Sequence, residues 1–143
     1  RRWEAVLAAA EARGLAAVEI GPHAPTIEGG RDALRRVLAS RATAVIGYND
    51  LVAIGVMQAA ADRDVAVPRD LSVAGFDDIF GSELIVPALT TVRTDLVAAG
   101  RGAATMVLER IGDATRASQH AVLPTSLVVR GSTGTAPAAN PTA

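Results

Sequence analysis

The stretch V-P-R-D-L-S-V-A-G-F-D-D, residues 67–78, decides how the rest of this chain is interpreted. A turn at Pro68 leads into a short apolar run, which ends abruptly on the carboxylates of Asp77 and Asp78. A continuous apolar run of this length after a helical segment predicts a strand that is buried on both faces. Open α/β sheets bind ligands at the carboxyl edge of their strands, so the end of this strand is a candidate site.

The composition limits the size class of the protein and its chemistry. With 143 residues the chain has the size of one domain, and with 50% hydrophobic but only 3% aromatic residues its core must be mainly aliphatic. A net charge of −1 argues against a basic face that binds nucleic acid. The absence of cysteine excludes disulfides and thiolate ligands. No apolar run approaches the roughly 18 residues of a membrane span. The first residue is not Met, so we expect the true N-terminus to lie outside this chain.

Helix and strand signals alternate in the first half of the chain, which implies parallel βα units with right-handed crossovers. The small and polar residues from Gly131 onward predict a disordered tail. In the last predicted helix, Gly100 and Gly102 are destabilising unless something packs closely against them. The pattern predicts helices over residues 3–13, 30–40, 51–61 and 95–111, strands over 16–20, 43–47, 71–76, 89–92 and the end of 122–130, and a loop with a helical turn over 79–87.

No catalytic or metal-binding pattern is present in the sequence. His23 and His120 are far apart, and neither lies at a metal-ligand spacing. The chain also lacks a Gly-x-Ser-x-Gly elbow, a Gly-x-Gly-x-x-Gly loop and a phosphate-binding Gly-Lys-Ser/Thr loop. We therefore expect no catalytic residue, no metal ligand and no cofactor, and we rank an enzyme well below a binding protein.

A polar rim at one edge of the sheet is the stronger hypothesis. Parallel strands would bring the loop of His23 to the same edge as the pairs 49–50 and 77–78. Amide and carboxylate groups suit a ligand with many hydroxyls, such as a sugar. Each of these residues could also have a purely structural role. For Asp50 a helix cap is favoured over ligand binding, and for Asp78 a turn is favoured. For Asn49 and Asp77 the two roles are evenly matched, and His23 is most simply a solvated loop side chain.

Four segments occur in the order and approximate spacing of a known family: Y-N-D-L-V-A-I-G-V-M-Q-A (48–59), V-P-R-D-L-S-V-A-G-F-D-D (67–78), P-A-L-T-T-V-R (87–93) and L-P-T-S-L-V-V-R-G-S-T (123–133). Together they resemble the effector-binding domain of the lactose/galactose repressor (LacI/GalR) family of bacterial transcription regulators. The resemblance implies an α/β fold with a three-layer parallel sheet of the periplasmic binding protein-like type. This chain would hold the C-terminal lobe and one helix, 95–111, of the N-terminal lobe. The domain would span 1–133, and the tail would span 134–143.

The resemblance also implies which residues act. Polar contacts to a sugar effector fall on Asn49 and Asp77, with a further contact at Thr94, where the family often has Gln. His23 lies in the segment where the family often places a stacking aromatic, and a ligand-contacting Arg is expected just before residue 1. The C-terminal lobe of such regulators forms a homodimer, which would place Ile54 and Ile85 at the interface.

The implied function is that of a cytoplasmic regulator whose effector allosterically controls operator DNA binding. The DNA-binding helix-turn-helix would lie outside this chain. A periplasmic sugar-binding protein of a transporter is the alternative, because that class shares the fold and the Asn-Asp helix start. The first strand of the lobe, between 16–20 and 43–47, would also be absent, so we expect the isolated chain to oligomerise, exchange elements or rearrange its sheet.

Overall fold

A four-stranded sheet forms the centre of the computed structural model, which describes residues 2–113, 115–117 and 119–136. The first three strands are parallel, and the fourth is antiparallel to the third. The expected parallel α/β arrangement is therefore confirmed, with one antiparallel strand added at an edge. In spatial order the strands are β1 (Ala44–Ile46), β2 (Ser72–Asp77), β3 (Thr90–Thr94) and β4 (Thr125–Val128).

The described helices agree with the sequence pattern to within two residues at every end except one start. They are α1 (Arg2–Glu11), α2 (Ile27–Ala39), α3 (Asp50–Ala61), the 3-10 turn η1 (Phe80–Glu83) and α4 (Leu96–Gly112). Helix α2 begins three residues before the predicted start at residue 30, because the side chain of Thr26 accepts a hydrogen bond from the backbone N–H of Gly29 at 3.2 Å. This is an ordinary N-cap, and the sequence analysis overlooked it. None of the helices in the described part of the chain is long and apolar enough to cross a membrane.

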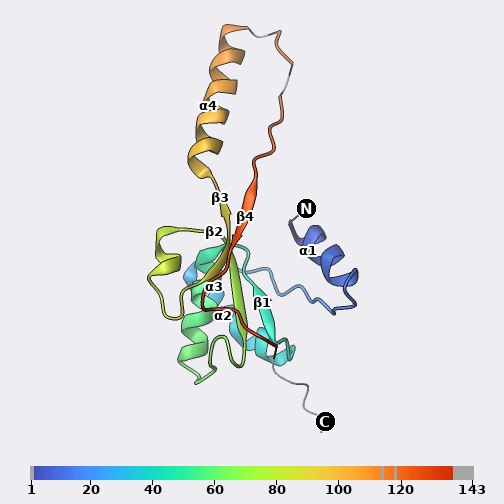
Figure 1. Cartoon of the computed structure of the whole chain (residues 1–143), viewed down its shortest axis with the longest axis vertical. Helices are drawn as coiled ribbons and strands as arrows, with labels where there is room; N and C mark the ends of the chain where they lie inside the picture. The colour runs from blue at the N-terminus through green and yellow to red at the C-terminus, as the bar shows by residue number, and fades with distance from the viewer. Residues whose placement is uncertain (1, 114, 118, 137–143) are drawn as a thin grey trace.

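The core lies between the sheet and helices α2 and α3 (Figure 1). Strand β2 alternates accordingly: Val73 and Gly75 are buried, whereas Ser72 and Ala74, on the opposite face, are half-buried. The described residues thus build two layers of the domain, the sheet and one helical layer. The buried apolar side chains are Ala33, Leu34, Val37, Ala53, Ile54, Val56, Met57, Ala59, Ala60, Leu71, Val73 and Leu89.

Helices α2 and α3 cross with their backbones nearly in contact, and two glycines permit this approach. A Cβ atom on Gly30 would collide with the carbonyl group of Val52 in α3. In the reverse direction, a Cβ atom on Gly55 would collide with the carbonyl group of Ile27 in α2. No side chain fits at either position, so the crossing depends on glycine at both.

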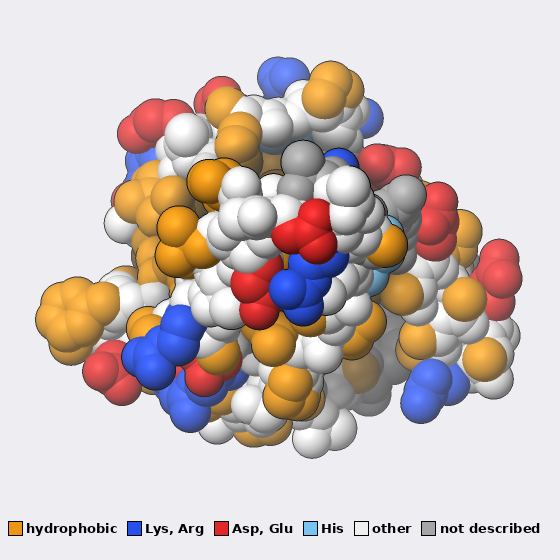
Figure 2. Space-filling view, turned by 90° about the horizontal axis from the view of Figure 1, so that it is seen from above, with side chains coloured by type: hydrophobic (Ala, Val, Ile, Leu, Met, Phe, Trp, Pro, Cys, Tyr) orange, Lys and Arg blue, Asp and Glu red, His pale blue; other side chains and the backbone are white. Residues whose placement is uncertain are grey.

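Strands β3 and β4 carry residues 95–124 away from the core as an excursion that contains α4 (Figure 1). None of the residues of α4 is buried. Several of its apolar side chains are exposed, and Figure 2, which looks down on this end of the molecule, shows apolar side chains next to charges of both signs. The excursion is therefore connected to the core mainly through the two-stranded ribbon of β3 and β4.

The predicted strand over residues 16–20 is wrong, because this segment forms no ladder with any described strand. Backbone N–H and C=O groups define a strand only when a neighbour pairs with them. β1 pairs with β2 alone, so its other edge is open, but residues 16–20 do not pair with it. Leu15, just before this segment, and Val18, within it, are both exposed.

The prediction of a disordered tail from Gly131 onward is also wrong for its first residues. Ser132 is fully buried between the amino ends of β2 and β3. Its hydroxyl donates to the carbonyl oxygen of Val73 at 2.6 Å and accepts from the backbone N–H of Thr90 at 2.8 Å. Its own carbonyl oxygen accepts from the N–H of Val73 at 2.8 Å. The last part of the predicted tail, 137–143, lies outside the described residues.

Candidate functional site

The candidate site is the carboxyl edge of the three parallel strands. Asn49 follows β1, Asp77 is the last residue of β2, and Thr94 is the last residue of β3. The three positions lie at the ends of neighbouring strands, so the fold brings them to one edge, as parallel pairing requires. Asn49, Asp77 and Thr94 are all half-buried.

Asn49 caps α3 and also ties a distant loop to the sheet edge. Its side-chain oxygen accepts from the backbone N–H of Val52 at 2.9 Å, while its amide nitrogen donates to the carbonyl oxygen of Pro25 at 3.2 Å. The loop 21–25 is held at its other end by Arg36, which donates to the carbonyl oxygen of Gly21 at 3.0 Å. An amide carries two donor hydrogens, so one N–H of Asn49 is still available for a ligand.

His23 lies in this tethered loop and is half-buried, so it is not the solvated side chain that the sequence suggested. Its Nε2 atom is buried and has no hydrogen-bond partner among the described residues. Buried polar atoms are nearly always satisfied in folded proteins. His23 Nε2 is therefore a buried polar atom whose hydrogen bond the described residues do not supply.

The backbone at the end of β2 is unusual at two successive residues. Asp77 has a φ of 105° and Asp78 a φ of 51°, although neither is glycine. Such conformations are costly for residues with a Cβ atom and tend to occur at functional sites. They turn the chain sharply away from the sheet. The carboxylate of Asp77 forms no hydrogen bond or ion pair with any other described residue.

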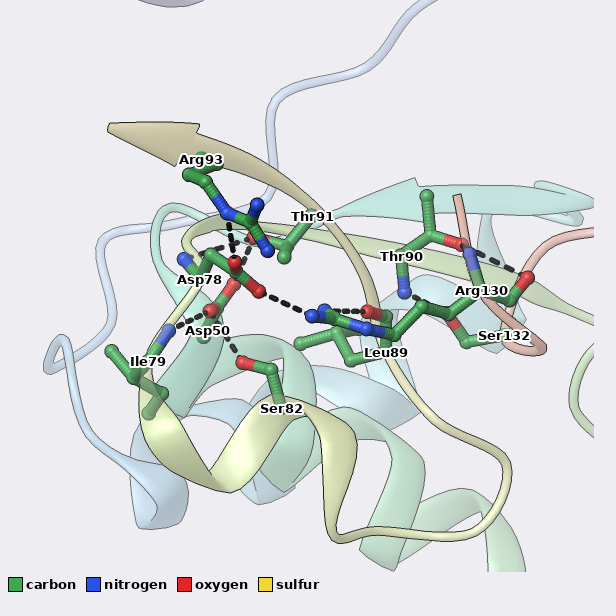
Figure 3. A network of polar contacts seen from close by, with 10 residues as sticks. All are labelled: Asp50, Asp78, Ile79, Ser82, Leu89, Thr90, Thr91, Arg93, Arg130 and Ser132. Carbon is green, nitrogen blue, oxygen red and sulfur yellow. Dashed lines mark hydrogen bonds and ion pairs between the residues drawn. The ribbon is translucent and has the colours of Figure 1, made fainter. Parts of the chain in front are cut away.

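Asp50 is fully buried, and its carboxylate holds three elements together (Figure 3). One oxygen accepts from the hydroxyl of Thr91 in β3 at 2.6 Å. The other accepts from the hydroxyl of Ser82 in η1 at 2.6 Å and from the backbone N–H of Ile79 at 2.9 Å. The expected role of Asp50 as a helix cap is wrong, because Asn49 caps α3. The sequence did not indicate this role of Asp50 because its three partners lie 29, 32 and 41 residues away along the chain.

The carboxylate of Asp78, which is 8% exposed, forms an ion-pair cluster with Arg93 and Arg130, which we call the Asp78 cluster (Figure 3). Its two oxygens accept from Nε of Arg93 at 2.6 Å and from the guanidinium of Arg130 at 2.7 Å. Burial by itself would raise the pKa of Asp78, but the hydrogen bonds and charges of the two arginines outweigh it and lower the pKa. Asp78 is thus more than the turn residue that the sequence suggested.

A guanidinium also lies at this edge, and the sequence analysis missed it. Arg2 lies over the rings of Tyr48 and Phe76, 5.0 Å and 4.6 Å from their centroids, and donates to the carbonyl oxygen of Tyr48 at 2.5 Å. Phe76 directly precedes Asp77 in β2 and Tyr48 follows β1, so Arg2 joins α1 to the carboxyl ends of these two strands. One signal was available: a cation in the first turn of a helix opposes the helix dipole, which suggests another role for Arg2.

The two residues expected at a dimer interface both lie in or against the core. Ile54 is 5% exposed within it, and Ile85 is half-buried and packs on it. Apolar side chains of the nearby segment around η1, Phe80, Leu84 and Val86, are exposed instead. No group of three or more His, Asp or Glu side chains that could hold a metal ion occurs among the described residues.

Comparisons with known proteins agree on one family. Residues 1–133 match the family model of the periplasmic binding protein-like domain. The HTH-type transcriptional regulator reg1 of Streptomyces lividans is 40% identical over 132 residues, which are 90% of this chain and 37% of the regulator. The chain thus spans little more than a third of the length of this relative.

Solved structures show the same similarity. A LacI family transcriptional regulator from Enterococcus faecium with bound ribose superposes with a TM-score of 0.84 at 27% identity, covering 92% of this chain and 50% of that one. The transcriptional regulator CelR in complex with cellobiose gives a TM-score of 0.85 at 29% identity, covering 92% of this chain and 41% of that one. The chain therefore belongs to the periplasmic binding protein-like domain family, in the form found in LacI-type transcriptional regulators.

Proposed function

We propose that this chain is the effector-binding region of a LacI-type transcriptional regulator and that it binds a sugar at the carboxyl edge of its sheet. The observation that carries the proposal is the carboxylate of Asp77, which the strained end of β2 places at this edge without a partner among the described residues. The ribose and cellobiose bound to related regulators support a sugar as the effector. The relatives' names favour a regulator over a transport protein.

The groups at the edge have the chemistry that a sugar requires. The carboxylate of Asp77 accepts from two neighbouring hydroxyls, and the free N–H of Asn49 donates to a ring or hydroxyl oxygen. Nε2 of His23 and the hydroxyl of Thr94 supply further polar contacts. The guanidinium of Arg2 is a charged donor that is already fixed by two aromatic rings. These groups bind and orient a ligand, and we propose binding without catalysis.

The effector acts by favouring one arrangement of the protein over another. Only a ligand with different affinities for two conformations can shift their equilibrium, and this differential affinity is then transmitted to DNA binding. In our proposal a helix-turn-helix outside this chain contacts operator DNA, and the protein acts in the cytoplasm. The regulator is a homodimer, with Ile54 and Ile85 behind an interface that includes the exposed side chains around η1.

Asp77→Asn tests this proposal. The substitution keeps the size of the side chain but removes the charge that strengthens hydrogen bonds to hydroxyls. We expect affinity for the bound sugar to fall about tenfold or more, since charge-assisted hydrogen bonds contribute roughly 1.5–3 kcal/mol. Calorimetric titration of the native protein with ribose and with cellobiose measures the change.

Asp32→Asn is the matched control, because Asp32 is an exposed aspartate on α2, away from the sheet edge. If both variants bind the sugar as tightly as the wild type, Asp77 is not a ligand residue. If the wild-type protein binds the sugar but the sugar does not change its affinity for operator DNA, the transport alternative is favoured.

A further inference from the structure

The Asp78 cluster lies where the excursion of residues 95–124 joins the core. Arg93 belongs to β3, the strand that enters the excursion, and Arg130 follows β4, the strand that returns from it. Both arginines bind the same carboxylate, at 2.6 Å and 2.7 Å. Each connection between the excursion and the core is therefore bonded to Asp78 (Figure 3).

The cluster is rigidly attached to the core. The side chain of Asp78 is only 8% exposed, and that of Arg130 15%. Arg130 also donates to the carbonyl oxygen of Leu89, a fully buried core residue, at 2.9 Å. Thr91 connects Asp78 to Asp50: its hydroxyl accepts from the backbone N–H of Asp78 at 3.4 Å and donates to the carboxylate of Asp50. A carboxylate that is this strongly buried and accepts from two charged donors favours one specific arrangement of the groups that it joins, although the side chain of Arg93 is itself 57% exposed.

The excursion itself has little else to fix its direction. Helix α4 contributes no residue to the core, and the ribbon is narrow, with Thr94 and Thr125 as its outermost pair. On its other side β3 pairs with β2 only as far as Arg93, opposite Asp77, so the pair of Thr94 and Thr125 has no third strand beside it. A two-stranded ribbon alone is only marginally stable. The angle at which the excursion leaves the sheet therefore depends on contacts at the base of the ribbon.

We infer that Asp78 is a positioning residue: through Arg93 and Arg130 it fixes the direction of the β3–β4 ribbon relative to the end of β2, where Asp77 lies. Asp78 does not contact the ligand. It keeps Asp77 and the ribbon residue Thr94 in a fixed relation, so that both can face one ligand. The part of this inference that concerns the ligand rests on the proposed function, whereas the part that concerns the ribbon does not.

Distance measurements between two spin labels test the inference without any ligand. The chain has no cysteine, so labels can be placed uniquely at Gln58→Cys on α3 and Ala103→Cys on α4, both exposed positions. In the full chain we expect one narrow distance distribution. Asp78→Asn should broaden it, because the neutral amide cannot hold two guanidinium groups. Arg93→Gln should broaden it less, and Arg93→Lys, which keeps the charge, should leave it narrow.

Val37→Ala is the control for a general loss of stability, because Val37 is buried in α2 and touches no member of the cluster. An unchanged distribution in Asp78→Asn would overturn the inference, and so would equal broadening in Val37→Ala. If Asp78→Asn does not fold, Arg93→Gln decides in the same way, since Arg93 is 57% exposed and its loss leaves the core intact.

Ribose titration of the native protein separates this inference from the proposed function. Misplaced binding groups weaken affinity steeply, so Asp78→Asn should bind ribose on the order of tenfold more weakly. Asp77→Asn should lose affinity while its label distances stay narrow. In one outcome, the wild type keeps a narrow distance distribution that Asp78→Asn loses, and yet binds no ribose. That result would support the positioning role of Asp78 and refute only ribose as the ligand.

Discussion

At the scale of single residues, three aspartates at one sheet edge have different roles because their surroundings differ. Asp50 is fully buried and accepts three hydrogen bonds, so its role is structural. Asp78 is paired with two arginines. Asp77 alone has a carboxylate without a partner among the described residues. Losing a partner of a buried charged group is much more costly than losing a surface ion pair, so the first two residues stabilise the edge that presents the third.

The pKa of Asp78 gives a prediction about pH at this scale. Because its pKa is lowered by folding, the stability contributed by Asp78 is fully present above the ordinary carboxyl pKa of 3.8 and is lost as the pH falls below it. Asp78→Asn should be roughly 2 kcal/mol less stable than wild type at neutral pH, and this difference should shrink toward zero in acid.

Urea unfolding of both proteins, at several values between about pH 7 and about pH 2, measures the difference. Asp70 and Asp113, whose pKa values are also lowered, are present in both proteins, so their contributions cancel. A difference in the free energy of unfolding that stays constant down to the lowest pH would contradict the assignment.

At the scale of elements, the crossing of α2 and α3 depends on backbone contact. Glycine normally weakens a helix, since alanine is favoured over it by about 1 kcal/mol. At Gly30 and Gly55 this preference is reversed, because a Cβ atom would collide with a carbonyl group of the other helix. In α4, by contrast, a Cβ atom on Gly100 would meet nothing within 4 Å among the described residues.

The same substitution should therefore have opposite effects in the two places. We expect Gly30→Ala to lower the free energy of unfolding by about 1–3 kcal/mol through overpacking. Gly100→Ala should raise it by up to about 1 kcal/mol through helix propensity. Urea denaturation of the two variants beside wild type is the measurement. Destabilisation by both, or by neither, would show that the close crossing is not as described.

Elements were the level at which the sequence was most informative. Periodicity located α3 and α4 to within one residue, and the apolar run after Pro68 located β2, because these signals are local. The prediction of a strand over 16–20 was wrong because a strand requires a partner, and strand pairing is not a local property of the sequence. The prediction of disorder at Ser132 was wrong for a related reason. Its small, polar neighbours suggest a loop, but hydrogen bonds to Val73 and Thr90 hold it in place.

From the sequence, we could predict which edge of the sheet holds the candidate site, but not the contacts of its side chains. Parallel strands place Asn49 and Asp77 at the same end of the sheet, and this follows from topology. The partners of each side chain do not, because they come from segments far away in the chain: Pro25 for Asn49, Arg130 for Asp78. For this reason sequence reasoning could not distinguish Asp77 from Asp78 by role, beyond what the family resemblance implied.

At the scale of the whole molecule, the exposed apolar side chains need partners. Phe80, Leu84 and Val86, around η1, are 80%, 62% and 96% exposed. Exposed apolar clusters next to a folded core mark interaction surfaces more often than chance. They border Ile85, which packs on the core, so the surface is continuous with a rigid support. This supports the proposed homodimer through the segment around η1.

Leu84→Asp should therefore weaken self-association at least about tenfold, which corresponds to roughly 1.4 kcal/mol for a central apolar contact. Leu15→Asp is a matched control, because Leu15 is 61% exposed, almost the same as Leu84, but follows α1. Sedimentation velocity of the wild type and both variants gives the dissociation constants. A wild-type chain that sediments as a single monomer, or equal weakening by both variants, would count against this interface.

The buried position of Ser132 between β2 and β3 has a practical consequence for protein engineering. Ser132 joins the amino ends of two central strands by hydrogen bonds. Two residues later, the backbone N–H of Gly134 donates to the side chain of Ser72. A reporter or affinity tag joined directly after Arg130 would remove the hydrogen bonds that Ser132 makes with Val73 and Thr90 at the amino ends of β2 and β3. Variants that retain residues through Gly134 keep these hydrogen bonds, which lie at the end of the sheet opposite the edge where the sugar is expected.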